Sequence, residues 1–262
     1  MFDTPAVSDV RPSHWPSVAE LPPSGDGLPT AQDRTSPAQG LQRVLRAVPA
    51  PAVDTGATGE RELVASEDSV TAGGVRDAYD MRLYREADGK YTVELDMKIE
   101  FEFTTGPDGQ TWTPETKQQF IEDYKRVVEG AWSGHTITSD SGQAVTLDVN
   151  LDVVENDGVA GNQNWSAEIV KIDEGGFNQS YVIPSQNTGV FDSEDVKPVE
   201  KGASDPQVGA AHEFGHMIGL PDEYNGSAGP EAANDTDSIM HTGMDVRDRH
   251  MDIIETWINA HD

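Results

Sequence analysis

The stretch AHEFGHMIGLPDEY, residues 211–224, is the part of the chain from which both the fold and a functional site can be inferred. His212 and His216 are four positions apart, so on a helix they lie on one face, one turn from each other. Two imidazoles in this arrangement can bind one metal ion, and zinc is commonly bound in this way. The stretch therefore predicts a helix that carries two ligands of a metal site.

A third ligand is needed, and the chain contains no cysteine to supply it. Gly219 can adopt a positive φ and end the helix, and Pro221 disfavours its continuation. The chain can then turn back, so that Asp222, six residues after His216, reaches the metal. The alternatives for this ligand are Glu223, His241 and His250.

The charge of the chain narrows the classes of partner. Its 262 residues include 47 acidic and 18 basic side chains, which gives a net charge of −29. Such a surface repels nucleic-acid phosphates and anionic lipids, so we expect neither nucleic acid nor a membrane as partner. No window approaches the 18 or so apolar residues that a membrane-spanning helix needs.

The first 74 residues have the composition of a disordered tail. Nine of the 16 prolines occur before residue 52, with Ser, Gly, Ala and Asp between them. Such a segment buries too little apolar surface to fold alone. One helical pattern, GLQRVLRAV at residues 40–48, indicates either a transient helix or a docking segment for the domain or a partner. No secretory signal is visible, so we expect a cytoplasmic protein or export by a non-classical route.

The chain from residue 75 to 262 is predicted to form one domain. Alternating residues on both sides of Asp88-Gly89 predict a β-hairpin. Thr113 as N-cap and Pro114 in the first turn predict a long amphipathic helix that ends near Gly134. The further strands are expected at residues 144–156, 165–173 and 181–184. Helices are expected at residues 206–220 and 246–260, which gives an α+β fold with one sheet packed against two helices.

The segment HEFGHMIGLPD, residues 212–222, resembles the metzincin signature HExxHxxGxxH/D in the version with aspartate as third ligand. That version is typical of the snapalysin-like bacterial zinc proteases. The resemblance implies a zincin-like catalytic domain over residues 75–262. Such a domain has a twisted mixed sheet, a backing helix, an active-site helix, a Met-turn and a C-terminal helix.

The same resemblance implies roles for individual residues. Zinc would be bound by His212, His216 and Asp222, with Glu213 as general base for a water molecule. DSIMHTG, residues 237–243, matches the Met-turn through Met240, with Met244 as a weaker candidate. Several metzincins have a tyrosine just after this turn, whereas this chain has His241. The possible oxyanion-stabilising or supporting residues are His241, Tyr224 and His250.

The resulting hypothesis is a monomeric zinc-dependent endopeptidase, a metalloprotease that hydrolyses protein or peptide substrates. We expect the substrate to lie along an edge strand near residues 165–183. Three alternatives stay open. The chain could be a non-proteolytic zinc-binding protein, a delivered effector or toxin with the tail as export segment, or an autoinhibited zymogen. In the last two cases the tail would bind a delivery partner or act as an inhibitory pro-segment.

Overall fold

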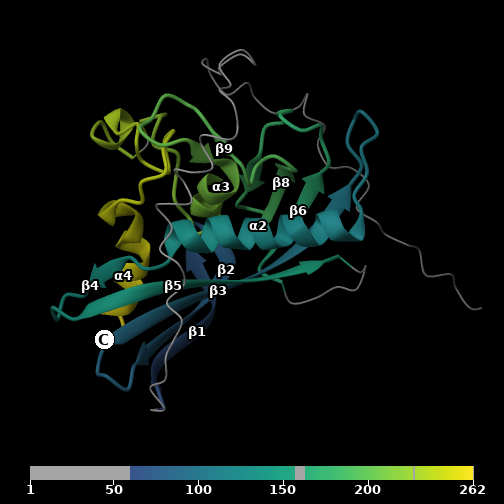
Figure 1. Cartoon of the computed structure of the whole chain (residues 1–262). Coiled ribbons are helices and arrows are strands. Elements are labelled where there is room, and N and C mark those ends of the chain that lie inside the picture. The colour runs from purple at the N-terminus through teal and green to yellow at the C-terminus, as the bar shows by residue number, and fades with distance from the viewer. Residues whose placement is uncertain (1–59, 157–162, 227, 262) are drawn as a thin grey trace, which may run out of the picture. The chain divides into compact units, whose positions relative to one another are not determined.

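The computed structural model describes residues 60–156, 163–226 and 228–261 (Figure 1). Residues 1–59, with the helical pattern at residues 40–48 and most of the predicted tail, lie outside the described residues. The strands are β1 (Glu62–Ala72), β2 (Val75–Arg85), β3 (Tyr91–Thr104), β4 (Thr136–Thr138), β5 (Ala144–Glu155), β6 (Trp165–Val170), β7 (Tyr181–Ile183), β8 (Thr188–Asp192), β9 (Pro198–Val199) and β10 (Gln207–Val208). The helices are α2 (Pro114–Trp132), α3 (Gly209–Met217) and α4 (Asp252–Asn259), with short 3-10 turns η2 (Ala232–Asn234) and η3 (Asp248–Met251).

The described residues form an α+β fold built on a curled mixed sheet of eight strands. Six follow the order β1-β2-β3-β6-β8-β7, β5 lies beside β3, and β4 lies beside β5. Strand β3 is the centre of this sheet. It pairs with β5 in parallel over residues 91–101, with β2 antiparallel over 91–96, and with β6 in parallel over 99–104. A strand has only two edges, so β2 and β6 share the edge opposite β5, one after the other.

The predicted hairpin and first helix are confirmed. Strands β2 and β3 pair across a turn in which Gly89 has a φ of +85°. Thr113 caps α2 with its side chain, which accepts a hydrogen bond from the backbone N–H of Thr116. Helix α2 lies across the sheet (Figure 1), and its Tyr124 ring packs edge-on against Phe101 of β3 at 5.0 Å. The hydrophobic core therefore lies between α2 and the sheet.

The domain begins earlier than the sequence predicted, because residues 62–72, assigned to the tail, form strand β1. Of its eleven residues, only Val70 and Ala72 are buried. Register shifts also interrupt its pairing with β2. An edge strand with so little buried surface has no clear alternation of apolar and polar residues. The boundary predicted at residue 75 is therefore wrong.

The C-terminal elements are shorter than predicted. Helix α3 covers residues 209–217 instead of 206–220, because residues 207–208 form β10 and Gly219, at a φ of +99°, reverses the chain. The last helix, predicted at residues 246–260, is divided into η3 and α4. Strands β8 and β9 were not predicted, because each is short and lies in a segment rich in turn residues.

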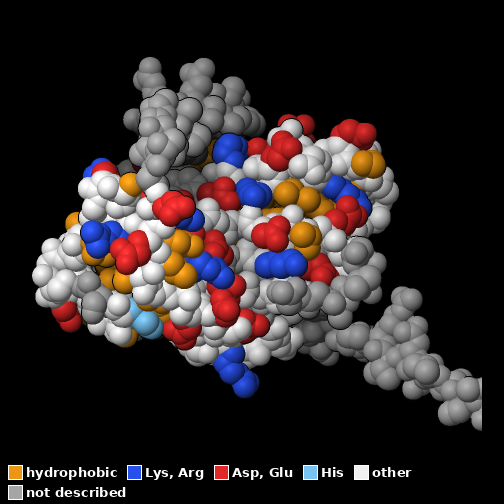
Figure 2. Space-filling model, turned by 90° about the horizontal axis from the view of Figure 1, so that it is seen from below, with side chains coloured by type: hydrophobic (Ala, Val, Ile, Leu, Met, Phe, Trp, Pro, Cys, Tyr) orange, Lys and Arg blue, Asp and Glu red, His pale blue; other side chains and the backbone are white. Residues whose placement is uncertain are grey.

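The surface in Figure 2 shows acidic side chains beside lysines and arginines, with small hydrophobic groups between them. Among the ion pairs of the described residues, Lys117 pairs with Glu155, and Arg82 pairs with both Asp68 and Asp96. In the described part of the chain, no helix is both long enough and apolar enough to cross a membrane.

Two glycines hold the end of α3 against the turn between β1 and β2. A Cβ atom at Gly73 would lie 2.0 Å from the carbonyl oxygen of Gly219, and a Cβ at Gly219 would lie 2.6 Å from the carbonyl oxygen of Ala72. The two backbones touch directly, so neither position has room for a side chain. This contact fixes where the chain leaves α3.

We predict that Gly73→Ala destabilises the domain more than Gly74→Ala. Both glycines have positive φ, so each alanine costs about 1 kcal/mol in backbone strain. Only Gly73 also meets backbone atoms, which adds roughly 1–3 kcal/mol, whereas a Cβ at Gly74 has nothing within 4 Å. Urea unfolding in the presence of a chelator measures both variants. Equal losses of free energy of unfolding would show that the contact contributes nothing.

Candidate metal centre

Helix α3 presents two histidine rings whose outer nitrogens are available to a metal ion. The Nδ1 atoms of His212 and His216 lie 2.7 Å from the carbonyl oxygens of Ile239 and Leu220, respectively. A carbonyl can only accept a hydrogen bond, so each Nδ1 carries the proton and donates it. In the neutral rings this leaves the Nε2 lone pairs as ligands. Such backing hydrogen bonds are typical of metal-binding histidines.

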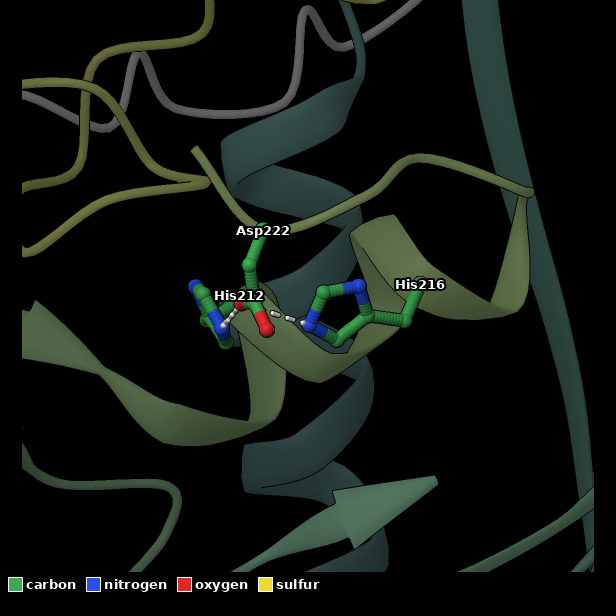
Figure 3. A group of neighbouring side chains, drawn as sticks. All are labelled: His212, His216 and Asp222. Carbon is green, nitrogen blue, oxygen red and sulfur yellow. Dashed lines mark ion pairs between the residues drawn. The ribbon is translucent and has the colours of Figure 1, made fainter. Parts of the chain in front are cut away.

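Asp222 returns to these two nitrogens after the chain reverses at Gly219 (Figure 3). Its Oδ1 lies 3.4 Å from His212 Nε2 and 3.1 Å from His216 Nε2. Donors about 2.0–2.1 Å from a tetrahedral zinc ion lie about 3.3 Å from one another. The two distances to Asp222 are close to this value, and all three atoms lie within 4.8 Å of one another, so the group could hold a metal ion.

The charges of the three groups favour a cation. Burial by itself would raise the pKa of Asp222, but hydrogen bonds from His212 and His216 hold it well below its usual range. Burial likewise acts to lower the pKa of His216, but the hydrogen bond to Asp222 and the charges of Glu213 and Asp222 raise it to about 9. In the absence of a metal ion, a proton on His216 therefore compensates the nearby carboxylates, and a bound cation would replace it.

The residues between the two histidines are fixed by packing. Glu213 is buried next to His212, the first candidate ligand, with 5% of its surface exposed. A Cβ at Gly215 would lie 2.2 Å from Met240 Sδ and 3.2 Å from the Trp132 ring, so only glycine fits there. Met240 is fully buried against the helix at this point. Met244 lies elsewhere, and its sulfur accepts the backbone N–H of Val208 at the start of α3.

The loop that carries Asp222 is tied to the turn around Met240. The backbone N–H of Glu223 donates to the carbonyl oxygen of Met240 at 3.0 Å, and Met240 N donates to Ser238 Oγ at 3.2 Å. The third candidate ligand and the methionine turn are therefore held at a constant separation. Residues 238–241 form a tight turn, closed by His241 N donating to Ser238 O at 3.0 Å.

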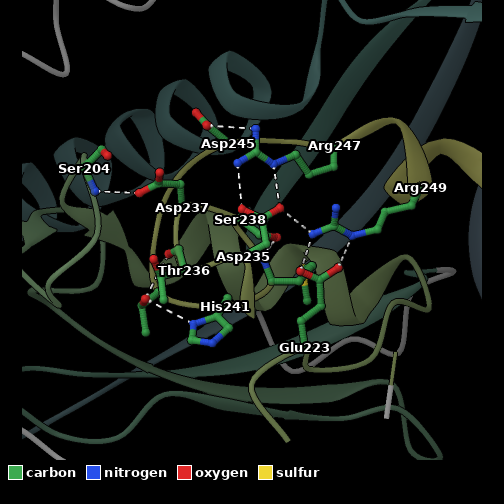
Figure 4. A network of polar contacts seen from close by, with 12 residues as sticks. Ser204, Glu223, Asp235, Thr236, Asp237, Ser238, His241, Asp245, Arg247 and Arg249 are labelled. Atoms are coloured by element: carbon green, nitrogen blue, oxygen red, sulfur yellow. Dashed lines mark hydrogen bonds and ion pairs between the residues drawn. The ribbon is translucent and has the colours of Figure 1, made fainter. Parts of the chain in front are cut away.

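Glu223 is an anchor for this loop, because its side chain pairs with Arg249 (Figure 4). Arg249 donates to both of its oxygens, at 2.6 and 2.8 Å, and His250 Nε2 donates to Oε1 at 3.1 Å. Burial acts to raise the pKa of Glu223, but hydrogen bonds, that from Arg249 first, lower it to about 2. The structure thus engages both Glu223 and His250 outside the ligand group.

The other sequence candidates lie at the rim. Tyr224 is 53% exposed, and its ring packs edge-on against His241 at 6.0 Å. Partial burial, the charge of Asp222 and a hydrogen bond with Asp222 raise the pKa of the Tyr224 phenol. His241 Nδ1 lies 3.1 Å from Thr242 Oγ1. Neither residue joins the candidate ligand group. Tyr224 contacts the group through its hydrogen bond with Asp222.

Sequence reasoning missed Gln207 and Lys201. Gln207 is 1% exposed, and its Nε2 donates to the carbonyl oxygens of Ile239 and His241 at 3.2 and 3.0 Å. It shares the Ile239 acceptor with His212 Nδ1. Its Oε1 accepts a hydrogen bond from Lys201 Nζ at 2.8 Å. A glutamine within the otherwise apolar or small PQVGAA, residues 206–211, was the available signal.

No protein-family model matches the chain, and no curated protein matches it either. The function of the site must therefore be inferred from its own residues.

Removal of a bound metal should destabilise the protein. We expect a chelator to lower the thermal unfolding temperature and zinc to restore it, since a ligand at 100 times its Kd stabilises the folded state by about 2.7 kcal/mol.

Asp222→Ala should weaken zinc binding at least about 100-fold, more than the loss of a supporting residue usually does. Asp245→Ala, at a carboxylate that pairs with Arg247, is the control and should retain zinc affinity. Equal zinc affinity in both variants would exclude Asp222 as a ligand.

The Arg249–Glu223 ion pair should contribute strongly to stability. Arg249→Met leaves the Glu223 carboxylate buried without its main partner, so we expect a loss of roughly 2–3 kcal/mol. Arg247→Met is the matched control. Its partners Asp235 and Asp245 are 23% and 51% exposed, and Asp235 keeps its bond to Arg249. We expect it to cost less than about 1 kcal/mol. Chemical denaturation of both variants in the presence of a chelator measures their free energies of unfolding. The two losses should be equal if the Glu223 carboxylate is solvated.

Proposed function

We propose that this protein is a zinc-dependent endopeptidase of the metzincin type. The observation that carries the proposal is the convergence of His212 Nε2, His216 Nε2 and Asp222 Oδ1 beside the buried carboxylate of Glu213. Two imidazoles and one carboxylate form a ligand set common in catalytic zinc sites, which keep a fourth position open for water.

The surroundings of this group support the finer assignment. Met240 lies beneath the histidine-bearing helix, and the third ligand follows a chain reversal at a glycine. The order of sheet, α2, α3, methionine turn and α4 is the one that the metzincin resemblance implies.

The roles of the chain's own residues follow from their positions. A zinc ion bound there would supply Lewis-acid chemistry, which lowers the pKa of a coordinated water from about 15.7 to about 7. The Glu213 carboxylate would accept the proton of the attacking water. It would then pass this proton to the amine nitrogen as the peptide C–N bond breaks. Burial of Glu213 keeps bulk water from competing for that proton.

A sheet edge next to α3 offers a place for the substrate. Strand β7 ends the strand order, pairs antiparallel with β8 and contacts α3. An extended peptide can add to such an edge through main-chain hydrogen bonds. Of the range predicted for this edge, β6 is interior, because it pairs with both β3 and β8. We therefore propose β7 as the substrate-binding strand.

The test combines metal analysis with a protease assay on casein and a peptide library. Wild type and Glu213→Gln should each bind one zinc ion, while only wild type cleaves substrate, with a loss of at least about 100-fold in the variant. Wild-type protein that binds zinc and cuts nothing would instead support a non-proteolytic zinc-binding protein. Equal cleavage by both proteins would exclude Glu213 as the general base.

A further inference from the structure

The two histidines of the candidate metal centre are held in place from different parts of the chain. His216 Nδ1 donates to Leu220 O, only four residues further along, and the N–H of Leu220 itself donates to Gly215 O at 2.9 Å. His212 Nδ1 donates to Ile239 O, which lies 27 residues away in the methionine turn. The first candidate ligand therefore depends on a distant carbonyl, which the geometry of α3 alone does not place.

This carbonyl matters because a histidine ring needs a partner to select its orientation. Rotation about the bond between Cβ and the ring is broad, and a half-turn exchanges each ring nitrogen for a ring carbon. A hydrogen bond at Nδ1 opposes that half-turn and so fixes the direction of Nε2. In His212, Nε2 lies 3.4 Å from Asp222 Oδ1 (Figure 3). The placement of Ile239 O thus decides whether this nitrogen faces the candidate ligand group.

Gln207 binds the carbonyl oxygens on both sides of Met240. Its Nε2 donates to Ile239 O at 3.2 Å and to His241 O at 3.0 Å, which uses both of its protons. The residue is buried, with 1% of its surface exposed. His212 Nδ1 lies 3.3 Å from the same Nε2, because both nitrogens donate to one oxygen. Gln207 therefore holds the acceptor of His212 in place and does not bond to the ring itself.

Lys201 fixes which end of the Gln207 amide faces the methionine turn. Its Nζ lies 2.8 Å from Oε1, and an ammonium can only donate, so the amide oxygen must be on the lysine side. The NH2 group is then left for the two carbonyls. A reversed amide would place its oxygen against Ile239 O and its NH2 group against the ammonium. Both contacts would be repulsive, so the lysine and the two carbonyls select the same orientation.

We propose that Gln207 is the positioning residue of the first candidate ligand. It holds Ile239 O against His212 Nδ1, so that Nε2 stays directed at the metal position, and Lys201 acts through it. The role rests on the proposed zinc site. Because it acts through His212, Gln207 needs no contact with the metal ion. His216 needs no such residue, because Leu220 supports that ring locally.

Ser238 is the other side chain that contacts this peptide group. Its Oγ accepts the N–H of Met240 at 3.2 Å, and that N–H belongs to the same peptide group as Ile239 O. The N–H and C=O of a trans peptide point in opposite directions. The serine therefore holds the group from its nitrogen side, whereas Gln207 contacts the oxygen that His212 uses. Ser238→Ala separates the two contributions.

The first test follows the Nδ1 protons of both histidines by NMR in the full-length protein with a chelator present. We expect Gln207→Met, which removes both donors, to speed exchange of the His212 Nδ1 proton with water about tenfold. Loss of one buried hydrogen bond corresponds to about that factor. The His216 proton is the internal reference and should exchange as in wild type. Lys201→Met, which leaves the buried glutamine in place, should cause the same selective change to a smaller extent. It decides by the same criterion if Gln207→Met does not fold.

The second test measures zinc affinity by competition with a chelator. Loss of a residue that orients a metal ligand typically costs about 10- to 100-fold, and we expect Gln207→Met to fall in this range. Gln143→Met is the matched control, because Gln143 Nε2 also donates to a backbone carbonyl, that of Ala144 at the start of β5. It should bind zinc as wild type does. Adding Lys201→Met to Gln207→Met should change the affinity less than about twofold, since the lysine acts through the glutamine.

Each outcome supports or overturns the role of Gln207. Unchanged exchange of the His212 proton in Gln207→Met and Lys201→Met would overturn it, as would an equal change at His216. A selective change in Ser238→Ala alone would assign the role to the serine. If wild type binds no zinc, the metal and peptidase proposals fail, while the exchange measurement still decides whether Gln207 positions His212. If wild type binds zinc but cleaves no peptide, only the peptidase proposal fails.

Discussion

The reversal of the chain at Gly219 is the constraint on which the candidate site depends. A helix that continued past residue 218 would carry Asp222 away from both histidines. Gly219 adopts a φ of +99° and lies against the backbone of the β1–β2 turn, so the chain leaves α3 in one direction only. As a result, Asp222 Oδ1 lies within 3.4 Å of both Nε2 atoms. Strand β1 thus contributes to the site indirectly, because the turn that follows it contacts Gly219 and limits where α3 can end.

Two buried layers hold the candidate ligands in place. Beneath α3, Met240 fills the space that Gly215 leaves, so the helix approaches the methionine turn closely. Next to Asp222, the third candidate ligand, Glu223 is held by Arg249 and His250. A carboxylate with 3% of its side chain exposed is tolerated because a bidentate arginine pairs with it. Such rigid support matters for a metal site, since small displacements of a ligand change its affinity for the ion.

Local sequence patterns predicted the elements that local forces stabilise. Asp88-Gly89 favours a tight hairpin, and Thr113-Pro114 starts a helix, and both were found where expected. Strand β1 was missed because its residues are mostly exposed and its pairing is irregular. Residues 62–72 form a strand because they make hydrogen bonds to β2. Such bonds need no alternation of apolar and polar residues, so the sequence pattern did not reveal them.

The sequence by itself determined the pair of histidines, the break in the helix at Gly219 and the suggestion that Asp222 follows as a ligand. These features depend on spacings of a few residues, where helix geometry dictates which side chains meet. Only the tertiary structure decided that Glu223 is an anchor, because its partner Arg249 is 26 residues away. The same holds for Gln207, which joins Lys201 to carbonyl oxygens 32 and 34 residues further along. Contacts over such separations depend on how the whole chain packs, and no local pattern encodes them.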